Sequence, residues 1–491
     1  MKLSSLIANA GVIELAGSPD PEITSVEYDS RRVAPGSLFA AIRGVRQDGT
    51  RFIPAAIEKG ASAVMFEEFS GERPTDTVFV RVADARRAMA LAAAEFYGHP
   101  SESLKVIGVT GTNGKTTTSY LIKAMVEAGG GKAGLLGTIA YLVGDRTLPA
   151  PNTTPESVDL QRLLAEMLSS GATHAAIEVS SHSLSLYRVA GCRFAVKVFT
   201  NFTQDHLDFH GDMDEYYAAK KGLFTSGGGV SVLNLDDPKG WDLAVSADGP
   251  VISYGINAAA DLTASDIRLT AGGMAFRLTA PTGEIEVVSP LTGRHNVYNV
   301  LAAAGAAVAL GLGLDAVTRG AANMSGVPGR FERVEAGQGF TVLVDYAHTD
   351  DALARAITAC REFTAGRVIT LFGCGGDRDK GKRPKMGYAA SLLSDIIVLT
   401  SDNPRSEDPM SIIAEVEAGI TEEGSKERGK GYFVAPDRAE AIRLAVGMAN
   451  PGDTVLLAGK GHEDYQITGA DKRHFDDREV AKEAIGRLLN K

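Results

Sequence analysis

Short apolar segments alternate along the chain with segments of helical periodicity. Residues 106–109 form a β-branched apolar run that leads into a glycine-rich turn at 111–114 and then into a helical segment. A second helical face consists of apolar residues three or four positions apart: Leu160, Leu163, Leu164, Met167 and Leu168. Thr154 and Pro155 before it predict an N-cap and a first-turn proline, and the apolar run 175–179 after it predicts the next strand. This alternation predicts a largely parallel α/β sheet.

The last third of the chain repeats the strand-then-loop pattern. Strand-like runs occupy residues 341–344, 368–372, 396–399 and 454–457. Each run leads directly into a polar or glycine-rich loop: residues 345–348, 373–378, 401–405 and 459–463. Because ligands bind beyond the carboxyl ends of the strands in open parallel sheets, we expect these loops to form one functional edge.

The first hundred residues form a pattern of their own. Runs at 61–66 and 78–80 predict strands, residues 85–97 predict a helix, and the break at 98–100 ends it. The chain of 491 residues is also about three times the ~150 residues of a single domain. We therefore expect several domains, with the first boundary at residue 100.

Composition and charge narrow the class of protein. Hydrophobic residues make up 44% and charged residues 23% of the chain, which is typical of a globular protein. The formal net charge of −11 argues against a general binder of nucleic acids or anionic membranes. The three cysteines, Cys192, Cys360 and Cys374, fit neither a disulfide framework nor a zinc site and indicate a reducing compartment.

The sequence predicts neither a membrane span nor a signal peptide. The longest uncharged apolar run, residues 301–314, is shorter than the roughly 18–20 residues that cross a bilayer and predicts a buried, alanine-rich helix. Asn9 and Glu14 interrupt the apolar region that a signal peptide needs. We expect a cytoplasmic, monomeric protein with no membrane insertion and no nucleic-acid partner.

The turn after residues 106–109 carries the strongest chemical signal. It comprises Gly111, Thr112, Asn113, Gly114, Lys115, Thr116 and Thr117. Glycines let backbone N–H groups close around phosphate oxygens, and the helix N-terminus favours negative charge. Lys115 is expected to reach the terminal phosphates of ATP, and the Thr116 hydroxyl to ligate Mg²⁺. Val109 stands where the strict spacing has glycine, so the loop is a variant; the alternative, a plain glycine turn, fits the strand and helix context less well.

Two other strand ends offer metal ligands. Glu178 ends the run at 175–178 and supplies the carboxylate that a phosphate-bound Mg²⁺ usually needs. His206 lies in the segment 205–208, which follows another apolar run and adds two carboxylates. Glu178 could instead lie at a solvent edge, and His206 alone is typical of a structural histidine. Their position beside the phosphate-loop strand favours a site.

These motifs occur in an order that resembles the Mur ligase family, from about Tyr28 to Glu463. The matching segments are residues 29–31, the variant phosphate loop, and residues 152–154, 178–182, 205–208, 219–220, 293–296, 329–332 and 345–348. The resemblance implies three α/β domains. These are an N-terminal UDP-sugar-binding domain at 1–100, a central P-loop ATPase with a parallel sheet at 101–331, and a C-terminal Rossmann-like, amino-acid-binding domain at 332–491.

The resemblance also implies a reaction. Within the family, the chain is similar to members that join meso-diaminopimelate to the D-Glu of UDP-N-acetylmuramoyl-L-alanyl-D-glutamate in peptidoglycan precursor synthesis, using ATP and Mg²⁺. The residues that would contact the UDP substrate are Tyr28, Ser30, Asn152, Thr153, Thr154, Ser180 and Arg188. Besides the phosphate loop, the residues that would bind ATP and Mg²⁺ are Glu178, His206, Asn296, Arg330 and Asp345. Lys220 matches a carbamylated, metal-binding lysine of the family, although an ordinary surface pair of lysines is the alternative.

The segment Asp402, Asn403, Pro404 and Arg405 is expected to select the acceptor. An arginine fork holds a carboxylate with two parallel hydrogen bonds, and diaminopimelate carries a distal carboxylate that lysine lacks. By resemblance, Arg378, Gly459 and Glu463 complete this pocket. Asp350 departs from the proline that related sequences often have.

The chemistry requires activation of a carboxylate, which does not react with an amine at neutral pH. The D-Glu carboxylate is expected to attack the γ-phosphate of ATP and form an acyl phosphate, which the acceptor amine then attacks. His348 is a further candidate on position alone. One alternative is a folylpolyglutamate-type synthetase, which segments 29–31 and 402–405 disfavour; another is a P-loop switch, which needs no amino-acid pocket.

Overall fold

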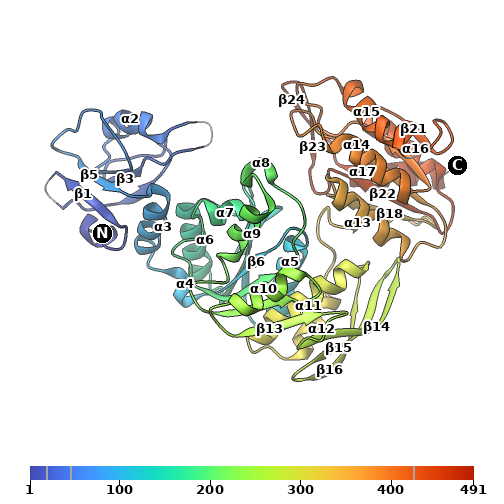
Figure 1. Cartoon of the computed structure of the whole chain (residues 1–491), viewed down its shortest axis with the longest axis horizontal. Helices are drawn as coiled ribbons and strands as arrows, with labels where there is room; N and C mark the ends of the chain where they lie inside the picture. The colour runs from blue at the N-terminus through green and yellow to red at the C-terminus, as the bar shows by residue number, and fades with distance from the viewer. Residues whose placement is uncertain (18–19, 45–46, 424–425, 491) are drawn as a thin grey trace. The chain divides into compact units, whose positions relative to one another are not determined.

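The chain forms two compact units. The computed structural model describes residues 1–17, 20–44, 47–423 and 426–490. The first unit contains residues 1–262 and 302–317, and the second contains residues 263–301 and 318–491. Figure 1 follows the chain from the blue N-terminus to the red C-terminus. This division differs from the three domains that the resemblance implies, and the boundaries of those domains stay predictions.

The first unit begins with a five-stranded sheet in the order β1-β5-β4-β3-β2. Its strands are β1 (Val12–Ala16), β2 (Ser25–Glu27), β3 (Ser37–Ala40), β4 (Ala63–Phe66) and β5 (Val78–Val82). All neighbours are parallel except β1, which is antiparallel to β5. Helices α1 (Leu3–Leu6) and α3 (Ala85–Phe96) share a core with alternate strand residues, while α2 (Ile53–Glu58) packs with the others. The predicted strands and helix of this region are confirmed.

The same unit contains a longer, mainly parallel sheet in which β13-β12-β11-β6-β10-β7-β8-β9 are neighbours. Its strands are β6 (Lys105–Thr110), β7 (Ala133–Leu136), β8 (Ala140–Val143), β9 (Arg146–Pro149), β10 (His174–Glu178), β11 (Phe194–Phe199), β12 (Val230–Asn234) and β13 (Val251–Gly255). Pairing is parallel from β13 to β7, as predicted, and antiparallel in the unpredicted β8 and β9.

The helices of this region position the loops at the strand ends. They are α4 (Pro100–Ser103), α5 (Lys115–Ala128), α6 (Ser157–Ser169), α7 (Ser181–Ser185), α8 (Leu207–His210), α9 (Met213–Lys221) and α10 (Pro238–Ser246). Four residues of the predicted apolar face of α6, Leu160, Leu163, Leu164 and Met167, pack into the core with Val106 and Ile177. Leu168 was wrongly included, because it is 39% exposed near the end of the helix. The predicted N-cap and first-turn proline are both wrong: α6 begins at Ser157, after Pro155, and Glu156 precedes it without a side-chain cap. The Thr154 hydroxyl instead donates to the buried carbonyl of Glu178 at 2.7 Å.

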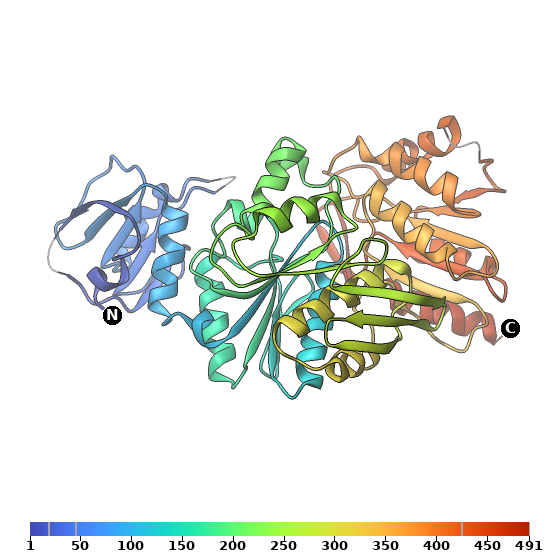
Figure 2. The same ribbon diagram turned by 60° about the horizontal axis from the view of Figure 1, so that its bottom comes forward.

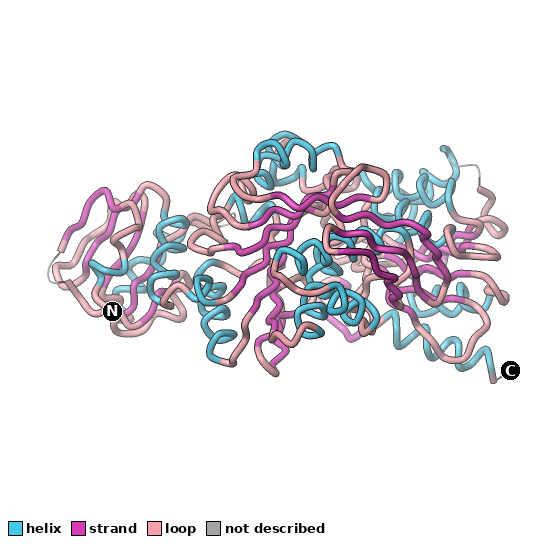
Figure 3. The backbone as a smooth tube through the Cα atoms, turned by 90° about the horizontal axis from the view of Figure 1, so that it is seen from below, coloured by secondary structure: helices cyan, strands magenta, loops and turns pink. Residues whose placement is uncertain are grey.

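The second unit contains an antiparallel ladder and a parallel sheet (Figures 2 and 3). The ladder comprises β14 (Leu262–Thr270), β15 (Gly273–Ala280) and β16 (Gly283–Ser289). Helices α11 (Arg294–Ala309) and α12 (Leu314–Ala322) follow it in the chain, and their residues within 302–317 belong to the first unit. Residues 300–307 of α11 are buried or nearly so, as expected for the alanine-rich run, although the helix ends before residue 314.

The parallel sheet has the order β17-β18-β22-β19-β20-β21. Its strands are β17 (Glu332–Arg333), β18 (Thr341–Asp345), β19 (Val368–Phe372), β20 (Ile396–Leu399), β21 (Tyr432–Val434) and β22 (Thr454–Ala458). All pairs are parallel except β17 with β18, so the four predicted strands are confirmed.

Helices cover both faces of this sheet. Alternate strand residues pack on α13 (Asp350–Arg361), α14 (Lys382–Leu393) and α15 (Pro409–Ala418), and the others pack on α16 (Arg438–Met448) and α17 (Asp477–Leu489). The hairpin β23 (Tyr465–Thr468) and β24 (Asp471–His474) follows β22 and was not predicted. Among the helices of the described part of the chain, none has the length and apolarity needed to cross a membrane.

Candidate active site

The phosphate loop joins β6 to α5 in the first unit. Gly111 and Gly114 have φ values of 141° and 86°, which L side chains rarely adopt. A Cβ atom on Gly111 would also lie 1.9 Å from Thr200 Oγ1. Lys115 Nζ donates to the carbonyl oxygens of Gly111 at 2.9 Å and Thr112 at 2.8 Å. The loop therefore holds a positive charge at the start of α5, where the helix dipole also favours an anion.

Glu178 lies beside this loop at the end of β10 and is fully buried. Its carboxylate accepts a hydrogen bond from Thr116 Oγ1 at 3.0 Å. It also accepts from the Thr138 backbone N–H at 2.9 Å and from Thr138 Oγ1 at 3.0 Å. The fold thus brings together the carboxylate and the hydroxyl that the sequence suggested as metal ligands.

Gly137 and Thr138 are members of this cluster that the sequence reasoning missed. Both residues directly follow strand β7. The pattern of a strand followed by a polar loop, which identified the other loops, could therefore have identified this one. A Cβ atom at Gly137 would lie 2.2 Å from Glu178 Oε1. Glycine is therefore required here to let the backbone approach the carboxylate.

Substituting Gly137→Ala should displace the Glu178 carboxylate and lower ATP-dependent activity at least tenfold. Overpacking of this kind costs about 1–3 kcal/mol of stability, which thermal unfolding measures. Gly313→Ala is the matched control, because no atom lies within 4 Å of a Cβ atom there and its φ is ordinary. Equal activity of the two variants would show that Glu178 does not need its observed position.

Lys220 is a buried amine next to the phosphate loop. Its side chain is 1% exposed, and Nζ donates to the Gly111 carbonyl at 2.9 Å and lies 4.6 Å from the centre of the Tyr216 ring. Burial, followed by the charge of Lys115, holds the pKa of Lys220 well below its usual value. The amine therefore has a neutral, nucleophilic form available, unlike the exposed surface lysine that was the alternative.

His206 has a left-handed backbone, with φ 53°, at the start of α8. Its Nε2 lies 3.5 Å from Asp205 Oδ2, and its ring centre is 4.9 Å from that of His182. The side chain of Asp208, the other carboxylate of this segment, lies outside the part of the chain that the structure describes. His182 is a further imidazole that the sequence reasoning did not assign.

The residues expected to contact the UDP substrate form two groups in the first unit. In one group, Arg188 donates to the Thr154 carbonyl at 3.0 Å and pairs with Glu156 at 2.8 Å. Thr154 Oγ1 also lies 3.4 Å from Ser180 Oγ, and the Asn152 carbonyl accepts from the Tyr141 hydroxyl. Thr153 joins the Glu178 cluster, because its Oγ1 lies 3.1 Å from Thr138 Oγ1.

The second group follows β2. Tyr28 donates its hydroxyl to Asp159 Oδ2 at 2.6 Å, and burial together with this carboxylate raises the pKa of Tyr28. The Ser30 carbonyl accepts from Lys59 Nζ at 2.9 Å. Asp159 and Lys59 are contacts that the sequence motifs did not reveal.

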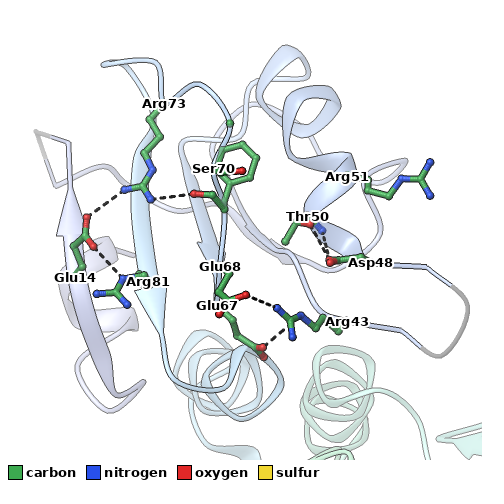
Figure 4. A pocket seen from close by; sticks show the side chains of 12 residues that line it. Glu14, Arg43, Asp48, Thr50, Arg51, Glu67, Glu68, Ser70, Arg73 and Arg81 are labelled. Atoms are coloured by element: carbon green, nitrogen blue, oxygen red, sulfur yellow. Dashed lines mark hydrogen bonds and ion pairs between the residues drawn. The ribbon is translucent and has the colours of Figure 1, made fainter.

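The first unit also has a polar pocket of about 710 Å³ at the N-terminal sheet (Figure 4). Glu14 pairs there with Arg73 and Arg81, and Arg43 pairs with Glu67 and Glu68. Because these charges already have counter-ions, the pocket is a weaker candidate for anion binding than the phosphate loop.

Several predicted ATP-site residues lie in the second unit. The Asp345 carboxylate, at the end of β18, accepts from the backbone N–H groups of Phe331 and Ala347, each at 2.9 Å, and burial raises its pKa. The Arg330 guanidinium lies 4.7 Å from the centre of the Tyr346 ring. His348 is exposed, and its Nδ1 lies 2.8 Å from the Tyr346 carbonyl. Asn296 is buried on α11 and donates to the Thr292 carbonyl at 2.7 Å.

The residues predicted to bind the acceptor lie in the loops that follow β19, β20 and β22. Asn403 Nδ2 donates to Glu463 Oε2 at 2.9 Å, so the two loops are joined directly. Arg405 has φ 52°, a conformation rare outside glycine, and donates to the Gly376 carbonyl at 2.8 Å. Its guanidinium forms no ion pair with a carboxylate of the described chain. Gly459 has φ 110° in the same region, and Pro404 is buried, while Arg378 is exposed.

A buried ion pair that the sequence did not reveal supports these two loops. Arg438 and Asp477 are both fully buried and pair at 2.6 Å. Arg438 also donates to the carbonyls of Ala458 at 3.0 Å and Ser401 at 3.5 Å, the residues that precede Gly459 and Asp402.

Removing only Arg438 should destabilise the fold, because Asp477 would stay buried without a partner. We expect Arg438→Met to cost about 3–5 kcal/mol in denaturant unfolding. The double substitution Arg438→Met with Asp477→Leu should recover most of that stability and still raise the acceptor KM, because the two carbonyls lose their donor. A double variant with a normal KM would show that the pair does not hold the loops in place.

Comparisons with known proteins agree with this geometry. Residues 22–97, 109–307 and 329–461 match family models described as "Mur ligase family, catalytic domain", "Mur ligase middle domain" and "Mur ligase, glutamate ligase domain". Two curated relatives, from Geobacter metallireducens and Geobacillus kaustophilus, are each 48% identical and are named UDP-N-acetylmuramoyl-L-alanyl-D-glutamate–2,6-diaminopimelate ligase. The alignments cover 100% and 99% of this chain and 99% of each relative.

Solved structures show the same fold. A structure titled as a UDP-N-acetylmuramoyl-L-alanyl-D-glutamate–2,6-diaminopimelate ligase matches with a TM-score of 0.72 and 33% identity over 100% of both chains. A folylpolyglutamate synthase of Mycobacterium tuberculosis complexed with ADP and AMPPCP covers 82% of this chain and 95% of its own, with a TM-score of 0.60 at 19% identity.

The fold, the phosphate loop and these matches define an ATP-dependent ligase that forms an amide bond. The chain belongs to the Mur ligase family.

Proposed function

We propose that the chain joins meso-diaminopimelate to the D-glutamyl carboxylate of UDP-N-acetylmuramoyl-L-alanyl-D-glutamate, with cleavage of ATP to ADP and phosphate. The observation that carries this proposal is the acceptor pocket. There, Arg405, which forms no ion pair among the described residues, lies in the same loop as Asp402, and Asn403 of that loop donates to Glu463. Such a pocket matches an amino-acid group that bears both a carboxylate and an ammonium. The names of the relatives point to the same acceptor.

The residues beside the phosphate loop fit Mg²⁺. Glu178 and Thr116 offer hard oxygen ligands at the start of α5. In the described part of the chain, no three His, Cys, Asp or Glu side chains are grouped to hold a metal by themselves. This agrees with Mg²⁺, which usually binds one or two carboxylates together with substrate phosphates. When bound, it would neutralise charge on the transferring phosphoryl group.

Lys220 would complete this ligand set as a carbamate, with His206 as a further ligand. Only a neutral amine attacks CO₂, and the lowered pKa of Lys220 increases the fraction of that form. The attack forms an N–C bond, and the nitrogen loses a proton. The product is an anion that replaces a cation next to the phosphate loop. This resolves the repulsion that a charged Lys220 would have with Lys115.

The reaction needs two steps. Lys115 and the N–H groups of the loop would hold the γ-phosphate while the substrate carboxylate attacks it, giving ADP and an acyl phosphate. The acceptor amine would then attack the acyl carbon, form the amide bond and expel phosphate. The residues that would hold the UDP substrate are Tyr28, Ser30, Asn152, Thr153, Thr154, Ser180 and Arg188. Asn296, Arg330 and Asp345 would contact ATP.

An amino-acid panel with mass analysis of the product tests the acceptor. The purified protein, ATP, Mg²⁺ and the UDP-muramyl dipeptide should give a tripeptide product with diaminopimelate and little with lysine. Product with a different amino acid would overturn the acceptor assignment. Phosphate release that depends on neither substrate would instead favour the P-loop switch.

The fold is shared with a folylpolyglutamate synthase, so the fold alone does not choose the acceptor. Replacing the UDP-muramyl dipeptide by a folate and diaminopimelate by glutamate should abolish product formation. The cytoplasmic location and the monomeric state stay predictions.

A further inference from the structure

The turn that carries Arg330 is held by the carboxylate of Glu332. Of the segment 329–332, only Arg330 is part of the proposed function. Glu332 lies in β17, and its Oε2 accepts a hydrogen bond from the Gly329 backbone N–H at 2.6 Å. Gly329 has φ 64°, and a Cβ atom there would lie 1.9 Å from the His462 backbone nitrogen. The turn therefore lies in direct contact with the loop after β22, and Glu332 binds one of its backbone groups.

A second carboxylate binds the turn on the other side of Arg330 in the chain. The Phe331 backbone N–H donates to Asp345 Oδ2 at 2.9 Å. Phe331 has φ 49°, a conformation that costs free energy in a residue other than glycine and persists only when the surrounding structure holds it. The backbone N–H groups just before and just after Arg330 are thus both bound by carboxylates, one from β17 and one from β18.

The Arg330 side chain makes few contacts of its own. Its guanidinium lies 4.7 Å from the centre of the Tyr346 ring, and its buried Nε has no hydrogen-bond partner in the described part of the chain. An arginine fork binds a phosphate group well only when its N–H groups point at the oxygens. The direction of this side chain therefore depends on the backbone that carries it.

Arg478 orients Glu332 from the last helix of the chain. Its Nη1 donates at 3.2 Å to Glu332 Oε2, the same oxygen that binds the Gly329 N–H. Its Nε and Nη2 form a bidentate pair with Asp476, the N-cap residue of α17. Because Asp476 holds one edge of the guanidinium, the remaining N–H group has a fixed direction toward Glu332.

We propose that Glu332 is a positioning residue for the nucleotide: together with Arg478 it fixes the turn so that Arg330 points at the phosphate groups of ATP. Glu332 acts through Arg330 and does not itself bind ATP. This inference rests on the proposed function, in which Arg330 contacts ATP, and extends it to two residues that no motif had assigned.

The test is the binding of a non-hydrolysable ATP analogue with Mg²⁺ to the full-length protein, measured by calorimetry. Glu332→Met keeps the size of the side chain and removes the acceptor oxygen. Arg330→Ala and Glu332→Met should each weaken binding about tenfold. The double variant should bind no more weakly than Arg330→Ala, because Glu332 then has no guanidinium to position. A further loss in the double variant, or a single variant that binds as the wild type does, would overturn the inference.

Two conservative variants separate positioning from a general loss of structure. Glu332→Gln keeps an oxygen for the Gly329 N–H and should restore most of the affinity that Glu332→Met loses; equal losses in the two variants would contradict the inference. If Glu332→Met folds poorly, Arg478→Lys replaces it in the same comparison, because lysine keeps a charge beside Asp476 but lacks the fork that reaches Glu332.

Glu335→Ala is the matched control. Glu335 pairs with Arg333 on the exposed part of the same segment, so its removal should leave binding of the analogue unchanged. A loss in this variant equal to that in Glu332→Met would show that any removed carboxylate of the segment has the same effect, and would overturn the inference. Wild-type protein that binds the analogue but forms no product with diaminopimelate would overturn the proposed function instead.

Discussion

Lys220→Ala should lose most of its ligase activity and recover part of it when short carboxylic acids are added. The substitution removes the buried amine that would become an anionic metal ligand beside the phosphate loop. Loss of one group that stabilises a transition state costs about 2.7–4 kcal/mol, or 10²–10³ in kcat. A free carboxylate that enters the vacated space can supply the missing anion. The measurement is product formation at saturating substrates, with and without acetate or formate.

The neighbouring lysine provides the matched control. Lys221 pairs with Asp242 at the surface, and Lys221→Ala should keep wild-type activity. Full activity of Lys220→Ala would contradict a role for this amine. If Lys220→Ala loses activity and no added acid restores it, the loss would be assigned to the missing hydrogen bond with the Gly111 carbonyl rather than to a missing carbamate.

Arg405→Ala should raise the KM for diaminopimelate and lower the discrimination against lysine. A charge-assisted bidentate pair contributes about 1.5–3 kcal/mol, which corresponds to a 10- to 150-fold change in KM. Lysine lacks the distal carboxylate, so its KM should change little. Arg405→Lys should recover only part of the affinity, because a lysine keeps the charge and loses the planar fork.

Steady-state kinetics with both amino acids measures this difference. Arg487→Ala is a suitable control, because Arg487 pairs with Glu483 on the exposed face of α17 and should have no effect on either KM. If Arg405→Ala discriminates against lysine as well as the wild type does, the acceptor pocket is assigned to the wrong loop.

The strands and loops around both sites were predictable because their signals are local. A β-branched run followed by glycines and a helical face indicated β6, the phosphate loop and α5, and the structure has these elements within two residues of the prediction. The same reasoning placed Glu178, Asp345 and Asp402 near strand ends. Thr154 was different: its sequence context is typical of an N-cap, but its hydroxyl bonds to a carbonyl 24 residues away.

The contacts that define each site were not predictable in this way. Thr138 meets Glu178 across 40 residues, and Lys220 meets Gly111 across 109. Arg438 reaches Asp477 across 39 residues. No periodicity or turn signal specifies such pairs, because they depend on which strands become neighbours.

The sequence by itself determined the α/β pattern, the ends of the strands and the residue types found there, since periodicity and turn chemistry act over a few residues. Only the tertiary structure decided that Lys220 and Arg438 are buried and which carboxylates and carbonyls they meet. Burial and charge pairing depend on how distant parts of the chain pack together. They determine whether a lysine is an exposed surface cation or a buried amine that can take part in a reaction.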